Sequence, residues 1–180
     1  MKKILSLPAF VHTIIGVIVL LMCSSLPSAA QSPNEEAIKK LIVSETEHFL
    51  NADYPAWSAC FVQTPYLLWS VTNGGEAGDV ITNRGWEEFS KAMKTGWFDA
   101  KPEAWAKEMR KSTITRLNWN IQIRGNVAWV SYTQRAETPE QKVESTETRV
   151  LERIEGTWRI AMQTTLTDFK DATPPIRSKY

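Results

Sequence analysis

Apolar residues recur every three or four positions between residues 33 and 50, a spacing that predicts a helix. Glu35 and Glu36 suit the start of this helix, because carboxylates near a helix N-terminus are stabilised by its dipole. A carboxylate is also expected on the buried face. That face is formed by Ile38, Leu41, Ile42, Glu45 and Phe49.

Two further helices are predicted from their ends and their apolar spacing. Asp53 is a residue type that caps helices, and Pro55 fits the first turn of a helix that ends near residues 63–65. Its buried residues are expected to be Trp57, Cys60 and Phe61. A third helix is predicted after Asn83 and is expected to end at Gly96, because glycine often terminates helices. Its inner face carries Trp86, Phe89 and Met93.

The later part of the chain alternates between apolar and polar residues, which is the period of a β-strand. The strand predicted after the turn at residues 124–126 is apolar on both faces in its first half, which is typical of a central strand covered on both sides. The predicted strands span residues 66–72, 80–82, 113–124, 127–137, 143–154 and 157–167. Helices followed by one late antiparallel sheet predict an α+β fold with a pocket at the open end of the sheet.

The first thirty residues have the pattern of a secretory signal peptide. Lys2 and Lys3 precede a largely apolar run, and the small residues Ser28 and Ala30 fit cleavage after Ala30. An uncleaved membrane anchor is the alternative, although Pro8 interrupts the apolar run. We therefore expect a secreted or periplasmic protein, which would associate with a membrane only if this segment is retained.

Cleavage would leave one domain over residues 31–170 and an exposed tail over residues 171–180. The whole chain has 21 basic and 20 acidic residues, so the loss of Lys2 and Lys3 changes its net charge from +1 to −1. A chain so close to neutral offers no electrostatic basis for binding nucleic acid. Cys60 would be the one remaining cysteine, and no internal disulfide is expected.

Motifs that resemble a known superfamily run through nearly the whole mature chain. They are Ile38 through Phe49, Asp53 with Trp57, Tyr66 with Trp69, Arg84-Gly85-Trp86, Gly125 to Val130, and Thr148 to Glu152 leading to Gly156 to Ile160. Together they resemble the nuclear-transport-factor-2-like (NTF2-like) or SnoaL-like superfamily, and within it a secreted bacterial group of unknown function.

The resemblance implies a cone-shaped, cystatin-like fold, in which N-terminal helices pack on a curved antiparallel sheet around a central cavity. It also implies frequent dimerisation through the sheet. It implies no single activity, because enzymes of this fold such as ketosteroid isomerase and scytalone dehydratase place different polar residues in the same cavity. This chain has Gln163-Thr164-Thr165 where relatives often carry a histidine.

Glu45 is the leading candidate for a catalytic residue. A carboxylate on an apolar helix face would lose its hydration, which suits a general acid or base. The alternative is an ion pair with an arginine of the sheet, such as Arg149 or Arg116. His48 is the only histidine of the mature chain, so a multi-histidine metal site is excluded, and we expect neither a metal nor another cofactor.

Eight tryptophans lie in the mature chain, and most are expected in the core. Some are expected to line the cavity, where flat rings cover the apolar surface of a ligand. The expected ligand-pocket residues are Trp57, Trp69, Trp129, Tyr132 and Gln163.

The leading hypothesis is therefore a secreted domain that binds a small, mostly apolar molecule without catalysis. One alternative is a cofactor-independent lyase, isomerase or hydrolase, in which Glu45 is the general base and Gln163 or Tyr132 polarises the substrate. The other alternative is a dimeric interaction module that uses an exposed sheet face.

Overall fold

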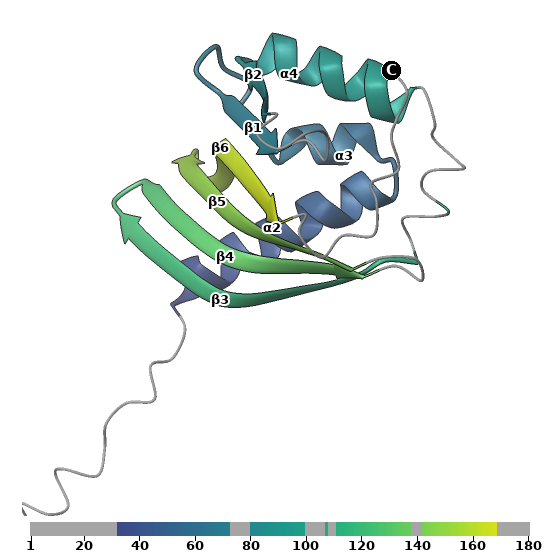
Figure 1. Cartoon of the computed structure of the whole chain (residues 1–180). Coiled ribbons are helices and arrows are strands. Elements are labelled where there is room, and N and C mark those ends of the chain that lie inside the picture. The colour runs from purple at the N-terminus through teal and green to yellow at the C-terminus, as the bar shows by residue number, and fades with distance from the viewer. Residues whose placement is uncertain (1–31, 73–79, 100–106, 108–110, 138–141, 169–180) are drawn as a thin grey trace, which may run out of the picture. The chain divides into compact units, whose positions relative to one another are not determined.

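The computed structural model describes residues 32–72, 80–99, 107, 111–137 and 142–168 (Figure 1). Residues 34–180 form one compact unit, separate from residues 1–33, and the description below concerns that unit. The predicted signal peptide, the loops at residues 73–79 and 138–141, Trp105 and the tail lie outside the described residues.

The first two helices match their predicted starts. Helix α2 spans Pro33–Leu50, as predicted, and α3 spans Tyr54–Ala59, a few residues shorter than expected. The Asp53 carboxylate accepts a hydrogen bond of 3.1 Å from the backbone N–H of Ala56, which confirms Asp53 as the cap of α3. Within the described residues no helix combines the length and the apolar character that crossing a membrane requires.

The third helix continues past its predicted end. Helix α4 spans Trp86–Met93 and runs into the π-helical turn η1, Lys94–Phe98, so the expectation that Gly96 terminates the helix is wrong. Glycine ends helices by adopting a left-handed backbone, and Gly96 does not adopt one. The buried Phe98 ring fixes the extra turn by packing edge-on against Tyr54 at 5.2 Å.

The described strands form one six-stranded sheet in the order β2-β1-β6-β5-β4-β3. All neighbouring strands are antiparallel except β1 and β6, which are parallel. Gly125 (φ 60°) is left-handed at the first tight turn, and Glu155 (φ 50°) and Gly156 (φ 83°) are left-handed at the second. The strands are β1 Leu68–Thr72, β2 Val80–Arg84, β3 Thr113–Arg124, β4 Val127–Glu137, β5 Lys142–Ile154 and β6 Thr157–Asp168.

Two irregularities interrupt the long strands and curve the sheet. In β3 the register with β4 shifts between Leu117 and Asn120, where Asn118 has a φ of 57°. In β5 the register with β6 shifts between Val150 and Leu151. Bulges of this kind bend a strand and increase its twist. Helix α2 lies against one side of the sheet and crosses the strands at an angle (Figure 1).

We call the sheet face that packs against the helices the inner face, and the opposite one the outer face. Apolar residues of the inner face form the core with Ile38 and Ile42 of α2, and they include Ala128, Val130, Leu151 and Ile160. The outer face of β4 is exposed, because Val127 is 45 % and Trp129 is 51 % exposed. The prediction that β4 is covered on both sides is therefore wrong for the described chain, since its helices all lie on the inner face.

Aromatic rings fill the space between α3, α4 and η1. The ring of Trp57 is 1 % exposed and lies 4.8 Å from Phe61, 5.3 Å from Phe89 and 5.1 Å from Phe98. Trp86 adds a further ring to this cluster, 6.4 Å from Trp57. Of the described tryptophans, Trp57 and Trp158 are buried and three more, Trp69, Trp86 and Trp119, pack against the core. Trp97 is 40 % and Trp129 is 51 % exposed, so the core contains fewer tryptophans than the sequence predicted.

Candidate binding site

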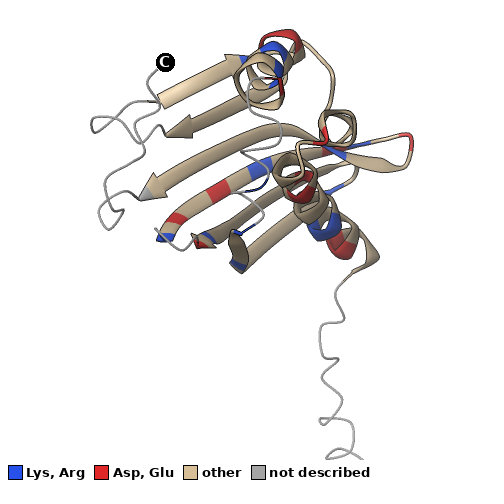
Figure 2. Cartoon of the chain, turned by 90° about the vertical axis from the view of Figure 1, so that its right-hand side faces the viewer, with Lys and Arg blue, Asp and Glu red and all other residues tan. Residues whose placement is uncertain are grey.

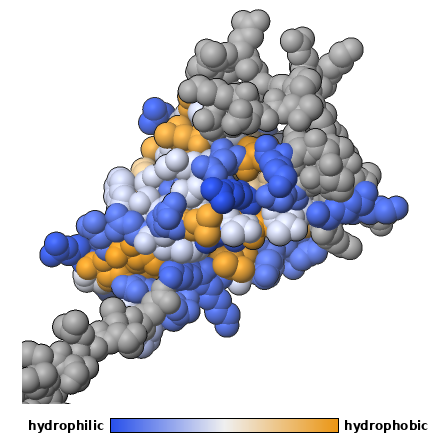
Figure 3. Space-filling view, turned by 60° about the horizontal axis from the view of Figure 1, so that its bottom comes forward, coloured by the Kyte–Doolittle hydropathy of each residue, from blue (hydrophilic) through white to orange (hydrophobic). Residues whose placement is uncertain are grey.

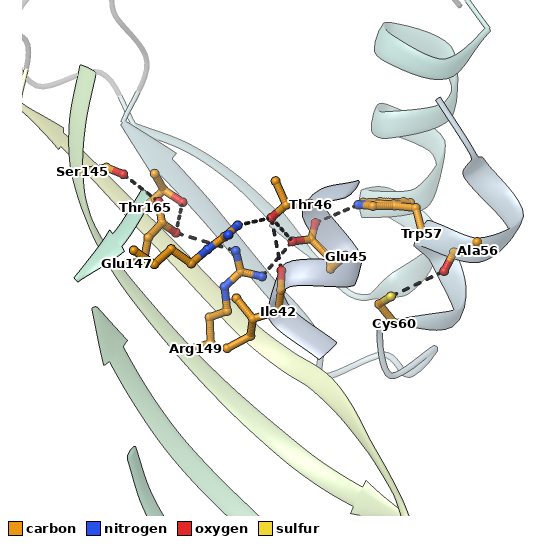
Figure 4. A network of polar contacts seen from close by, with 11 residues as sticks. Ile42, Glu45, Thr46, Ala56, Trp57, Cys60, Ser145, Glu147, Arg149 and Thr165 are labelled. Atoms are coloured by element: carbon orange, nitrogen blue, oxygen red, sulfur yellow. Dashed lines mark hydrogen bonds and ion pairs between the residues drawn. The ribbon is translucent and has the colours of Figure 1, made fainter. Parts of the chain in front are cut away.

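Glu45 lies on the buried face of α2 and is held at both carboxylate oxygens (Figure 4). The indole N–H of Trp57 donates to Oε1 at 2.9 Å. The guanidinium of Arg149, on the inner face of β5, forms an ion pair with Oε2 at 3.0 Å. Of the two interpretations of Glu45, the ion pair with an arginine of the sheet is the one that the structure contains.

A second buried carboxylate, Glu147, lies two residues before Arg149 on the same strand and face. Ser145 Oγ donates to its Oε1 at 2.8 Å, and Thr165 Oγ1 of β6 donates to its Oε2 at 2.9 Å. Arg149 Nη2 lies 3.9 Å from the same oxygen. Glu147 is 1 % exposed, so this carboxylate is desolvated but well supplied with donors (Figure 4).

Arg149 remains charged in this environment. Burial by itself would lower the pKa of its guanidinium, but Tyr132, Glu45 and Glu147 raise the pKa above its ordinary value. Burial also raises the pKa of the Tyr132 phenol, so Tyr132 is a neutral O–H group at neutral pH. The site therefore contains fixed charges and an uncharged tyrosine side by side.

Tyr132 lies on the inner face of β4, next to the edge strand β3. Its ring stacks on Trp119 of β3 at 4.4 Å and 29°. The guanidinium carbons of Arg116 and Arg149 lie 5.9 and 5.8 Å from the centre of the same ring, within reach of a cation–π interaction. Arg116 also donates to Thr46 Oγ1 of α2 at 2.6 Å, which ties β3 to the helix.

Several buried polar atoms around Tyr132 have no hydrogen-bond partner within the described part of the chain. Strand register places their residues on the inner faces of four adjacent strands, so the outermost are separated by about 15 Å, given a strand spacing of about 4.8 Å. We call these residues the inner-face polar cluster. The atoms are Arg116 Nε, Tyr132 OH, Gln134 Oε1, Arg149 Nε and Gln163 Oε1.

The structure sorts the predicted pocket residues into three groups. Tyr132 and Gln163 belong to the inner-face polar cluster, and Trp69 lies beside Gln163 in register, stacked on Phe89 of α4 at 5.4 Å. Trp57 is a core residue that also orients Glu45. Trp129 lies on the outer face, so its expected place in the cavity is wrong.

Sequence reasoning missed Gln134 and Glu147, although the strand period contained the signal. Ser145, Glu147 and Arg149 alternate in phase with the core residue Leu151, so three polar residues in succession occupy the buried face of β5. A strand that only packs against the core would carry apolar residues at these buried positions. A polar run in the buried phase of a strand is the sequence feature that would have located this cluster.

Cys60, the one cysteine of the predicted mature chain, is buried next to the end of α3. Among the described residues no three His, Cys, Asp or Glu side chains come together as a metal site would require. The Cys60 thiol is buried and donates to the carbonyl of Ala56 at 3.4 Å. Acidic and basic residues are otherwise interspersed along the strands and helices of the described chain (Figure 2).

No protein-family model matches this sequence, and no curated protein matches it either. Solved structures do match. An NTF2-like protein of unknown function from Shewanella oneidensis is 17% identical with a TM-score of 0.55, over 73% of this chain and 97% of that one. A protein of unknown function with a cystatin-like fold from Nostoc punctiforme is 12% identical with a TM-score of 0.57, over 77% and 95% of the two chains.

A candidate scytalone dehydratase from Novosphingobium aromaticivorans is 16% identical with a TM-score of 0.56, over 82% of this chain and 95% of that one. Together these similarities show that the chain has the NTF2-like, cystatin-like fold. The resemblance read from the sequence motifs is thereby confirmed at the level of the fold. Identities this low carry no residue roles from one chain to another.

Proposed function

We propose that this domain binds a small molecule at the inner-face polar cluster. The observation that carries the proposal is the set of five unpartnered buried polar atoms gathered there. Buried polar groups in folded proteins are almost always hydrogen-bonded, and each exception calls for an explanation. A bound molecule with its own donors and acceptors would supply the missing partners.

The polar character of the cluster changes the kind of ligand that we expect. The tryptophans predicted a mostly apolar ligand, but Trp57 is a core residue and Trp129 lies on the outer face. The rings near the cluster are Trp119 and Trp69, both half-buried. They could cover the flat part of a ligand, whose polar groups would meet Tyr132 and the glutamines.

The proposal contains no reaction step. A general base needs a carboxylate oxygen that can approach the substrate, and both oxygens of Glu45 are engaged by Trp57 and Arg149. Structures of the same fold include candidates for scytalone dehydratase and ketosteroid isomerase. Those names support a small-molecule site in this fold, and they assign no chemistry to the residues of this chain.

Crystals of the protein soaked with a library of small polar fragments test the proposal. We expect fragments to bind within hydrogen-bond distance of the Tyr132 hydroxyl, and Tyr132→Phe to weaken the hits several-fold in solution. Tyr66→Phe is the matched control, because the Tyr66 hydroxyl donates to Glu152 at 2.7 Å on an exposed surface. Fragments found only elsewhere, with ordered water alone at the cluster, would overturn the proposal.

A second function, an interaction between two copies of the chain, is favoured by one observation on the outer face. Val127, Trp129 and Leu166 are each about half exposed there. In a view from below Figure 1, the apolar side chains lie in patches separated by hydrophilic ones (Figure 3). In analytical ultracentrifugation we expect the wild-type protein to sediment as a dimer and the Trp129→Gln variant to sediment as a folded monomer. A wild-type protein that is monomeric at every concentration would exclude this function.

A further inference from the structure

The charges of the inner-face polar cluster are balanced by two neighbouring carboxylates, Glu45 of α2 and Glu147 of β5. Arg149 lies between two carboxylates, 3.0 Å from Glu45 and 3.9 Å from Glu147. Arg116 supplies the second positive charge and is linked to Glu45 through Thr46, whose hydroxyl accepts from Arg116 at 2.6 Å and lies 3.4 Å from Glu45 Oε2. Two guanidinium groups and two carboxylates therefore balance within one set of contacts.

The carboxylates of this set have no oxygen left without a donor. Glu45 accepts from Trp57 and Arg149, and Glu147 accepts from Ser145 and Thr165. A cation entering the site would have to share carboxylates that Arg149 already faces, since Arg149 lies 3.0 Å from Glu45 and 3.9 Å from Glu147. An anion would have Arg116 as a counter-ion but would lie close to both carboxylates, so the balanced charges of the site favour neither sign.

The atoms that remain unpartnered suit an uncharged group. The side-chain oxygens of Gln134 and Gln163 accept hydrogen bonds, whereas the Nε–H groups of Arg116 and Arg149 donate them. The Tyr132 hydroxyl does either. A ligand that pairs with neighbouring donors and acceptors of this set must carry both an acceptor and a donor, as a carboxamide does.

We propose that the inner-face polar cluster selects uncharged carboxamide-type ligands and discriminates against their acid and amidine analogues. The inference rests on the proposed function, because it concerns the same site. A charged analogue loses its hydration on entering a site whose net charge is already zero, whereas a neutral amide loses less hydration energy and regains it in hydrogen bonds. Half-buried rings at Trp119 and Trp69 favour a planar, aromatic amide.

Three probes of nearly equal size and shape test this inference at neutral pH: benzamide, benzoate and benzamidine. They differ in charge, being neutral, negative and positive. Titrations of the purified protein are followed through the indole N–H signals of its tryptophans in NMR spectra. We expect benzamide to shift the Trp119 signal, and benzoate and benzamidine to bind at least about tenfold more weakly.

Benzoate or benzamidine binding at the cluster as tightly as benzamide would overturn the inference and leave the proposed function standing. No shift with any probe would overturn the inference as well, and the fragment soak then decides the proposed function independently. Tyr132→Phe should weaken benzamide several-fold, and Tyr66→Phe should leave it unchanged. The comparison of the three probes needs no variant, so it holds even if a substitution disturbs folding.

Discussion

At the scale of single residues, Glu45 and Arg149 show that a buried charge can serve to hold the fold together. Their ion pair joins α2 to β5 across the core, and Trp57 adds a third anchor from α3. A pair of this kind gains little over apolar packing when intact, but removing one partner leaves the other buried and uncompensated. The position of α2 on the sheet therefore depends on both charges, that of Glu45 and that of Arg149, being present.

Replacing Arg149 by methionine should lower the free energy of unfolding by about 3 to 5 kcal/mol, because Glu45 and Glu147 would then be buried without their shared cation. Urea denaturation measures the change. Arg135→Met is the matched control: its ion pair with Glu144 is also short, at 2.7 Å, but both side chains are 52 % exposed. The control should lose at most about 1 kcal/mol. Equal losses in the two variants would contradict the structural role of Arg149.

The thiol of Cys60 should make stability depend on pH in the alkaline range. Burial raises the pKa of Cys60 from 9.0 to about 12, and the charge of Glu45 adds to the rise. The unfolded thiol ionises near pH 9 while the folded one stays protonated. The stabilisation is thus complete below pH 9 and is lost as the pH rises toward 12.

Urea denaturation of the wild type and of Cys60→Ala at pH 8 and pH 11 checks this effect. We expect the free energy of unfolding to fall less in the variant, because its other titrating groups are shared with the wild type. An identical fall in both proteins would show that Cys60 does not contribute. Alkylation by iodoacetamide at pH 8 should likewise be slow in the folded wild type and fast in urea.

At the scale of elements, the glycines next to α4 show which local signals determine backbone shape. Gly85 has a φ of 79°, and its N–H donates to the carbonyl of Leu67 at 2.7 Å. Gly96 lies inside η1 without a positive φ. The sequence predicted a special role for Gly96 because it follows the apolar period, but Gly85 is the residue whose conformation requires glycine.

Gly85→Ala should lower the free energy of unfolding by about 1 to 3 kcal/mol. Alanine at this position would have to adopt the left-handed backbone, which strains it. Its Cβ would also lie 3.1 Å from the carbonyl oxygen of Pro65. Gly96→Ala is the control, because a Cβ there meets no atom within 4 Å. It should be neutral or stabilise by up to about 1 kcal/mol. Thermal unfolding of the two variants gives the comparison, and a greater loss for Gly96→Ala would contradict it.

The elements themselves could be read from the sequence because each has a strong period and a clear end. Thr113–Arg124 alternates along its length, and α2 repeats apolar residues every three or four positions. The outer face of β4 could not be read in this way. A single sequence shows that Trp129 is apolar, but whether another element covers it depends on where the helices pack in three dimensions.

At the scale of the whole molecule, the sequence predicted the fold much better than the site. Each helix or strand is predicted from many residues together, so a wrong interpretation of one residue does not change the predicted architecture. The site instead depends on which side chains meet across four strands and one helix. The partners of Glu45 come from residues 12 and 104 positions away, a distance over which sequence patterns carry little information.

The last prediction concerns the segment before the compact unit of residues 34–180. The sequence pattern predicts cleavage after Ala30, and α2 begins at Pro33. Cleavage there would leave the whole of α2, Pro33–Leu50, in the mature protein. The mature domain should thus fold without residues 1–30.

Expression of the full chain in a bacterium that exports proteins should therefore release a species whose mass corresponds to residues 31–180. Its melting temperature should equal that of residues 31–180 produced directly, because none of the described core residues precedes Ile38. Full-length protein retained in the membrane fraction would instead support the uncleaved anchor. A lower melting temperature of the directly produced domain would show that the first thirty residues contribute to the fold.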